Sequence, residues 1–313
     1  MSSDLLNDSR LYCDYRELIR LKGQASSFTL LPQFKSGSVL SGRHGSRFRG
    51  RGLNFEELRH YNTGDDIRNL DWNVTLRTGK PHIRVYSEEK DYNVILCVDQ
   101  NSGMFFSSVN TMKSVIAVEL ATLCAWRILE DNDRIGLLIT EGEGVKWCKP
   151  VRSQKDFLNY LSVLCEVNNK LSALSVDSNQ NTFSGMVDRL VQLKMKNSVV
   201  VIFSDWYGAK EKDLTKLKHL QIHNDVLGVL ISDPYEKSIS KNYGAFTVTD
   251  GQYQLSLDSH LQLSKANQSI SEKYRQRVAD LTHMMAIKNL PLVQVSTDGQ
   301  HISQFKKAMG GLK

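Results

Sequence analysis

Short apolar runs alternate with helical patterns from residue 91 onward. The runs at 92–99, 198–205 and 224–233 are rich in Val, Ile and Leu, and each ends in an aspartate. Runs of this kind are typical of strands that are buried on both faces, as in a parallel sheet covered by helices. Helical spacing of apolar residues separates them, at 110–130, 153–167, 181–194, 212–221 and 260–289. The pattern predicts an α/β fold with a doubly wound, mostly parallel sheet.

Smaller elements complete the expected organisation. Two strands are predicted around the turn EGEG, a hairpin around Gly251, and a strand at 290–297 followed by a helix at 300–309. Residues 1–90 have a different pattern, with a helix that ends at Gly23, a segment rich in Gly, Ser and Arg, and a strand at 82–88. We therefore expect an N-terminal extension over 1–90 and a main domain over 91–313.

The composition is that of an ordinary globular protein, with 41% hydrophobic and 24% charged residues. The N-terminus lacks the basic and then apolar pattern of a secretory signal. The most apolar helical stretch is interrupted by Lys113, Glu119 and Arg127, so it does not suit a membrane span. The five cysteines form no CxxC pair, which favours reduced thiols. These features predict a cytoplasmic protein with no membrane span in this chain.

Positive charge is concentrated in one loop of the extension. The net charge is +6, and residues 42–52 contain Arg43, Arg47, Arg49 and Arg51 without any acidic residue. This Arg-rich loop is too short to indicate a nucleic-acid domain, and it lacks interleaved aromatic residues. It could bind a phosphate or an acidic surface of a partner.

Two of the buried strands end in Asp99 and Asp205. Carboxyl ends of parallel strands meet at one edge of a sheet, so we expect these carboxylates at the same rim. They could accept hydrogen bonds from loop amides and cap helices. Alternatively, they could share Mg²⁺, which prefers oxygen ligands.

The second alternative follows a resemblance to von Willebrand factor A-like domains, whose first metal motif is D-x-S-x-S. Its positions fall on Asp99, Asn101 and Gly103, while Thr182 and Asp205 lie where the family has its other ligands. The resemblance implies a metal-adhesion site of Asp99, Asn101, Thr182 and Asp205. Gly103 would contribute no ligand.

A longer motif precedes this domain. Its residues are Gly50, Gly52, Phe55, Arg59, Tyr61, Gly64, Asp65, Asp66, Arg68, Asp71 and Trp72. They match the pattern G-x-G-x-x-F-x-x-x-R-x-Y-x-x-G-D-D-x-R-x-x-D-W, and in this the chain resembles the family called domain of unknown function 58. The resemblance covers nearly the whole chain. It implies a bacterial protein that acts with a MoxR-type AAA+ ATPase, and no enzymatic activity is established for the family as such.

The segment GDDIRNLDW places three carboxylates and a guanidinium close together. Arg68 has the fork geometry to bind Asp66 or Asp71, and Trp72 is expected to bury its ring. The signature residues Arg59 to Trp72 could form an ion-pair and capping cluster that joins the extension to the main domain. They could instead form a loop that faces a partner.

We expect a non-enzymatic interaction module, an adaptor for a MoxR-type AAA+ ATPase and its protein client. The chain has no G-x-S-x-G and no Walker A motif, so neither a serine nucleophile nor a nucleotide site is predicted. One alternative is a Mg-dependent phosphoesterase-like enzyme that uses Asp99, Asp205 and Asp233. A second is phosphate or nucleic-acid binding through the Arg-rich loop, which the modest net charge argues against.

Overall fold

The computed structural model describes residues 8–28, 53–88, 93–142, 144–175, 182–238, 246–249, 254–257 and 260–310. The chain divides into two compact units. The small unit is Gly42–Asp91, and the larger unit combines Met1–Ser41 with Tyr92–Lys313. The larger unit therefore contains two short helices, α2 (Tyr15–Arg20) and α3 (Lys22–Ala25), which the sequence pattern assigned to the N-terminal extension.

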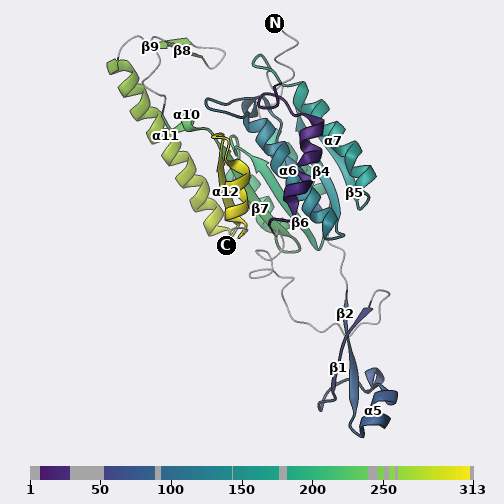
Figure 1. Ribbon diagram of the computed structural model, residues 1–313. Helices are drawn as coiled ribbons and strands as arrows, with labels where there is room; N and C mark the ends of the chain where they lie inside the picture. The colour runs from purple at the N-terminus through teal and green to yellow at the C-terminus, as the bar shows by residue number, and fades with distance from the viewer. Residues whose placement is uncertain are drawn as a thin grey trace. The chain divides into compact units, whose positions relative to one another are not determined.

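The larger unit is built on a six-stranded sheet (Figure 1). Its strands, in spatial order, are β10 (Leu292–Ser296), β7 (Asp225–Ser232), β6 (Ser198–Ser204), β3 (Asn93–Val98), β4 (Arg134–Glu141) and β5 (Gly144–Val151). Every neighbouring pair is parallel except β4 and β5, which run antiparallel. The structure confirms the predicted α/β fold with a mostly parallel sheet.

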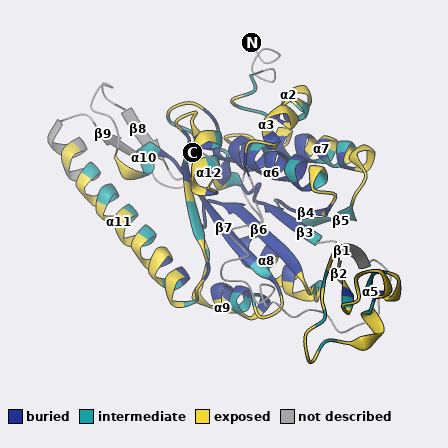
Figure 2. Cartoon of the chain, turned by 60° about the horizontal axis from the view of Figure 1, so that its bottom comes forward, coloured by how far each residue is buried: buried dark blue, intermediate teal, exposed yellow. Residues whose placement is uncertain are grey.

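Helices cover both faces of this sheet. In Figure 2 the strands are buried, and the outer surfaces of the helices on either side of them are exposed. Side chains of β3 alternate between two cores, with Leu96 in one and Ile95 in the other. The first core contains residues of α2 and α3 and of α6 (Lys113–Glu130), α7 (Gln154–Asn169) and α12 (His301–Ala308). The second contains residues of α8 (Thr182–Gln192), α9 (Glu211–Leu220) and α11 (His260–Ile287). The short helix α10 (Pro234–Lys237) and the hairpin of β8 (Phe246–Thr249) and β9 (Gln254–Leu257) lie between β7 and α11 in the chain.

The N-terminal helices belong to the larger unit because their apolar residues are buried against α6 and α7. Leu18 is buried, and its carbonyl accepts a hydrogen bond from Trp126 Nε1 at 3.0 Å. The backbone N–H of Cys13 donates to Asn168 Oδ1 at 2.9 Å. Gly23 does not end a helix as predicted, because the turn at Leu21 separates α2 from α3 and Gly23 lies within α3.

The small unit is an antiparallel pair of strands, β1 (Leu53–His60) and β2 (His82–Glu88). Between them lie a 3-10 turn, η2 (Ile67–Asn69), and the helix α5 (Trp72–Thr78). The structure confirms the predicted strand β2, whereas the sequence pattern did not indicate β1. Gly79 ends α5 with φ 70°, a left-handed conformation in which glycine has no steric cost.

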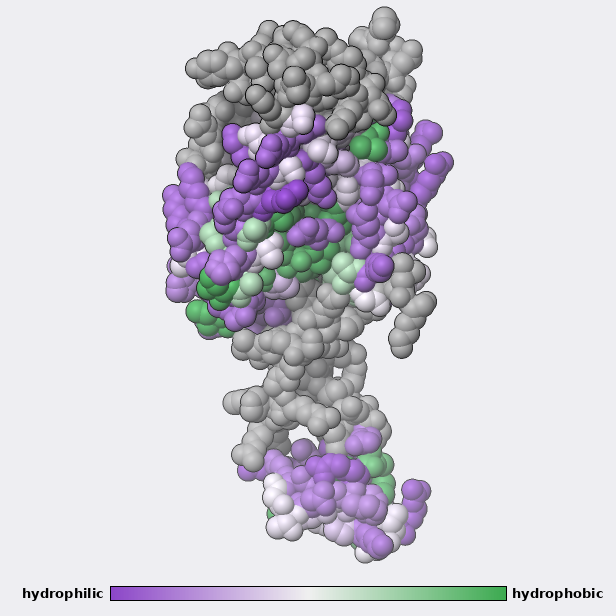
Figure 3. Space-filling view, turned by 90° about the vertical axis from the view of Figure 1, so that its left-hand side faces the viewer, coloured by the Kyte–Doolittle hydropathy of each residue, from purple (hydrophilic) through white to green (hydrophobic). Residues whose placement is uncertain are grey.

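Hydrophilic side chains surround a central apolar area on the face of the larger unit in Figure 3. Within the described ranges, no helix combines the length and apolar character that crossing a bilayer requires.

Candidate functional site

Three strands of the larger unit end in buried carboxylates. Asp99 follows β3, Asp205 follows β6 and Asp233 follows β7. These strands are adjacent and parallel, so the three residues lie at the same edge of the sheet. All three are buried. We call the group Asp99, Asn101, Lys113, Asp205 and Glu236 the strand-end rim.

Asp99 has a protein hydrogen-bond partner at each oxygen. Oδ1 accepts from Thr140 Oγ1 at 2.8 Å and from the backbone N–H of Asn101 at 3.2 Å. Oδ2 accepts from Ser204 Oγ at 2.7 Å and from Asn101 Nδ2 at 3.1 Å. Burial and the nearby charge of Asp205 raise the pKa of Asp99 to about 6, against the effect of these hydrogen bonds. The carboxylate is therefore mostly ionised at neutral pH.

Asn101 and Gly103 occupy the two motif positions that carry hydroxyls in the D-x-S-x-S pattern. The Asn101 amide is engaged at both ends, because Nδ2 donates to Asp99 and Oδ1 accepts from the backbone N–H of Met104 at 3.1 Å. A Cβ at Gly103 would lie 3.2 Å from Asn101 Oδ1 and 3.9 Å from Asp205 Oδ2. The two residues thus lie beside both strand-end carboxylates, and neither presents a hydroxyl.

Lys113, the first residue of α6, lies beside Asp205. Its Nζ is 2.7 Å from Asp205 Oδ2 and 2.9 Å from Glu236 Oε1. Burial by itself would lower the pKa of Lys113, but Asp205 and Glu236 outweigh it and raise this pKa. Likewise, burial would raise the pKa of Asp205, and the attraction of Lys113 lowers it overall.

Sequence reasoning missed Lys113 and Glu236 as members of the rim. It treated Lys113 only as a break in an apolar helix. The available signal was a lysine at the first position of an otherwise buried helix, where nearly every neighbour is apolar. A charged residue in such a place usually has a buried partner.

Thr182 and Asp233 are not joined to Asp99 and Asp205 by hydrogen bonds among the described residues. Thr182 begins α8 and is half-buried. Asp233 accepts from Ser108 Oγ and Thr297 Oγ1, each at 2.5 Å, and caps α10 through the backbone N–H of Tyr235. Asp233 therefore holds loops together at the same edge of the sheet.

The residues of the rim do not suit a divalent metal ion. Mg²⁺ needs oxygen ligands at about 2.0–2.1 Å in octahedral geometry. Asp205 Oδ2 contacts the Lys113 ammonium, and Asp205 Oδ1 accepts a hydrogen bond from the backbone N–H of Tyr207 at 2.9 Å. Both oxygens of Asp99 already accept hydrogen bonds from neighbouring protein groups. In the part of the chain that the structure describes, no three His, Cys, Asp or Glu side chains are grouped to hold a metal.

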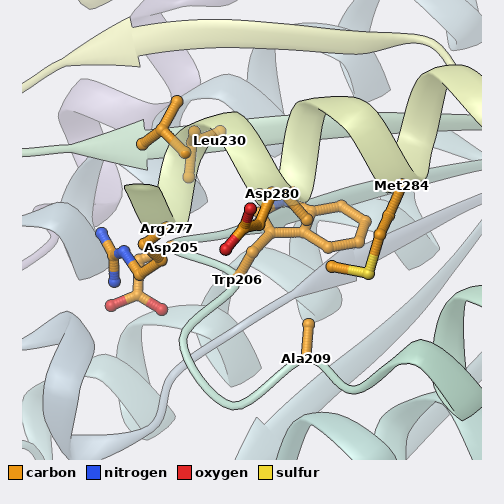
Figure 4. A pocket seen from close by; sticks show the side chains of 9 residues that line it. Asp205, Trp206, Ala209, Leu230, Arg277, Asp280 and Met284 are labelled. Atoms are coloured by element: carbon orange, nitrogen blue, oxygen red, sulfur yellow. The ribbon is translucent and has the colours of Figure 1, made fainter. Parts of the chain in front are cut away.

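A small cavity of about 140 Å³ lies next to the rim (Figure 4). Trp206 lines it together with Asp280 and Met284 of α11, and Asp205 and Arg277 lie at one end. Trp206 has φ 56°, which is unusual for a bulky side chain. Its Nε1 donates to the Val229 carbonyl at 3.1 Å, which anchors the loop after β6 to β7.

The signature residues of the small unit form ion pairs within that unit. Arg59 binds Asp65 through two contacts of 2.8 Å, which lowers the pKa of Asp65. Asp71 caps α5 by accepting hydrogen bonds from the backbone N–H groups of Asn73 and Val74. Its other oxygen binds Arg84 Nε at 2.8 Å, and this contact lowers the pKa of Asp71.

Two expectations for the small unit were wrong. Arg59 and Arg84, rather than Arg68, supply the guanidinium groups that bind Asp65 and Asp71. Asp66 accepts a hydrogen bond from the backbone N–H of Arg68. Trp72, the first residue of α5, is 62% exposed instead of buried. Arg43, Arg47, Arg49 and Arg51 lie outside the described residues.

Comparison with known proteins gives relatives without an assigned activity. The chain is 24% identical over 215 residues to the uncharacterized protein Rv1480 of Mycobacterium tuberculosis and to the uncharacterized protein Mb1516 of Mycobacterium bovis. Each match covers 69% of this chain and 66% of the relative, so it spans slightly less than two thirds of the relatives' length.

Solved structures similar to the chain include the conserved hypothetical protein BatB from Bacteroides thetaiotaomicron, with 12% identity and a TM-score of 0.37. That match covers 71% of this chain and all of BatB. A second similar structure is an uncharacterized membrane spanning protein from Vibrio fischeri, with 11% identity and a TM-score of 0.22. That match covers 72% of the present chain and all of the Vibrio fischeri chain. The model of the family described as "Protein of unknown function DUF58" matches residues 57–283, which is more than half of the chain. The chain belongs to the DUF58 family.

Proposed function

We propose that this protein is a non-enzymatic interaction module, an adaptor for a MoxR-type AAA+ ATPase, and that it contacts its partner at the strand-end rim and the loops beside it. The observation that carries this proposal is a group of exposed apolar side chains on those loops. Phe106 and Val109 follow β3, and Tyr207, which is 70% exposed, follows β6. Exposed aromatic residues around a rigid base are typical of protein contact surfaces.

The state of the buried carboxylates also supports an interaction role. Asp99, Asp205 and Asp233 each accept several hydrogen bonds from neighbouring protein groups. A general base or a metal ligand needs an oxygen that can reach the substrate or the ion. These three carboxylates are therefore better suited to holding loops in place than to a phosphoesterase reaction.

The choice of an AAA+ ATPase as partner rests on the family resemblance. Members of the domain of unknown function 58 family are thought to act beside MoxR-type ATPases, and family membership extends this expectation to the present chain. The ATPase would act on a protein client.

A pull-down of the tagged protein from its native lysate, with mass spectrometry of the bound proteins, tests the proposal. We expect recovery of an AAA+ ATPase, and we expect Tyr207→Ala to reduce that recovery because the variant removes an exposed ring next to the rim.

Ile222→Ala is the matched control. Ile222 is an apolar residue with 54% exposure that precedes β7, so it lies at the opposite edge of the sheet. Equal loss with both variants, or recovery of no ATPase by the unaltered chain, would contradict the proposal.

A further inference from the structure

Three residues of the strand-end rim form a network of ion pairs with Arg277 of α11, and this network has two cations and two carboxylates. Asp205, Lys113, Glu236 and Arg277 form a continuous chain of ion pairs, with Nζ–O distances of 2.7 and 2.9 Å for Lys113 and an Arg277 Nη2–Glu236 Oε2 distance of 3.0 Å. The two cations neutralise the two carboxylates. A buried carboxylate without such compensation would be strongly destabilising.

Lys113 is held in this position from several sides. Its backbone N–H donates to the Phe106 carbonyl at 3.1 Å, and its Nζ lies 5.9 Å from the centre of the Phe106 ring. The side chain is only 4% exposed. In this position the ammonium is shielded from solvent and lies directly between the two carboxylates.

Asn101 and Gly103, which replace the serines of D-x-S-x-S, are consistent with a site that holds a lysine in place of a metal ion. Asn101 uses its amide to bond Asp99 and Met104, and a side chain at Gly103 would come within 3.2 Å of the Asn101 amide oxygen. A hydroxyl ligand at 103 would thus crowd the residue that orders the loop. A divalent ion beside Asp205 would also face the positive charge of Lys113 at close range, and like charges in a buried site repel strongly.

We propose that the Lys113 ammonium is the permanent cation of the rim and takes the place that a divalent metal ion would otherwise fill, so that the isolated chain does not bind Mg²⁺ or Mn²⁺ there. The rim then keeps its shape at any concentration of divalent ions. This inference concerns the chain alone and does not depend on the proposed ATPase partner.

Titration of the purified chain with Mn²⁺, followed by the loss of the free-ion signal in electron paramagnetic resonance, tests the proposal directly. Melting curves with Mg²⁺ and with EDTA provide a second measurement. We expect no saturable binding at the rim and equal melting temperatures. Binding that is abolished by Asp205→Asn would overturn the proposal, whereas binding that survives this substitution lies elsewhere and agrees with it.

Three variants test the role of the lysine. Lys113→Gln leaves Asp205 and Glu236 without their shared cation, so we expect its melting temperature to fall by several degrees or more. The double variant Lys113→Gln with Asp205→Asn removes one charge of each sign. We expect its melting temperature to lie well above that of Lys113→Gln alone. Lys170→Gln is the matched control, because Lys170 also binds two carboxylates, Glu141 and Glu166, but is exposed.

An unchanged melting temperature for Lys113→Gln, or a double variant no more stable than the single one, would refute the charge argument. If Lys113→Gln does not fold, the double variant and the Mn²⁺ titration of the unaltered chain still decide the question.

Discussion

Asp99 is held by two hydroxyl groups whose orientation is set by the backbone. Thr140 Oγ1 accepts the N–H of Gln100 at 2.7 Å, and Ser204 Oγ accepts the N–H of Trp206 at 2.9 Å. Each hydroxyl then donates its own hydrogen to Asp99. Such chains of hydrogen bonds favour the ionised carboxylate and limit the rise in pKa that burial causes.

The raised pKa of Asp99 predicts a pH-dependent contribution to folding. Its pKa rises from 3.8 to about 6, so between these values the folded protein binds the proton more tightly than the unfolded chain does. Asp99 therefore favours the folded state below pH 4, and this contribution is lost as the pH rises through 6. At 1.36 kcal/mol per pKa unit, the change is about 3 kcal/mol.

Denaturant unfolding of the wild-type protein and Asp99→Asn from pH 4 to pH 7 measures this contribution. The advantage of the wild type over the variant should shrink as the pH rises, because only the wild type titrates at this position. A difference in the free energy of unfolding that is constant across the range would show that Asp99 keeps an ordinary pKa.

At the scale of elements, the loop after β6 packs against a position in β7 that has no side chain, Gly228. Trp206 adopts its left-handed conformation at a cost of roughly 1–3 kcal/mol, which its burial and its bond to Val229 offset. A Cβ at Gly228 would lie 2.7 Å from Trp206 Cζ2 and 2.9 Å from Leu292 Cδ1. Any larger residue at position 228 would therefore overlap the indole ring of Trp206.

Gly228→Ala is expected to lower the free energy of unfolding by about 1–3 kcal/mol, because the methyl group must displace the Trp206 ring or the neighbouring strand. Gly185→Ala is the control. Gly185 lies within α8 with no atom near its added Cβ, so the substitution should stabilise the protein by about 1 kcal/mol. Chemical denaturation compares them, and a Gly228→Ala protein as stable as the wild type would contradict the close packing.

The sequence predicted the elements of the larger unit well because each one is encoded locally. The uniform apolar runs of β3, β6 and β7 and the helical spacing of α6 need no knowledge of distant residues. The ion pairs of the rim could not be predicted in this way, since Lys113 and Glu236 are 123 residues apart in the chain. The pairing of Arg59 and Arg84 with Asp65 and Asp71 likewise depends on strand register, which the local pattern of GDDIRNLDW does not contain.

On the scale of the whole molecule, each of the two units has stabilising contacts of its own. The small unit relies on the β1–β2 pairing and on Asp71, which joins the start of α5 to Arg84 of β2. The larger unit has its own two apolar cores. We therefore expect each unit to be able to open without the other.

Hydrogen exchange measured by mass spectrometry tests this independence. Asp71→Ala removes the cap of α5 and the partner of Arg84, so we expect faster exchange over residues 53–88. Exchange in β3 and β6 should stay as slow as in the wild type. Faster exchange in those central strands would mean that the two units unfold together.

The N-terminal helices have a consequence for synthesis on the ribosome. Cys13 bonds a residue 155 positions further along the chain, and Leu18 bonds one that lies 108 positions away. These helices must wait for α6 and α7 to emerge, and closing so long a loop costs entropy before any contact forms. The strands β1 and β2 pair within 36 residues of sequence, from Leu53 to Glu88, so the small unit can fold first on the nascent chain. Helices α2 and α3 are thus translated before the small unit but dock after it has folded.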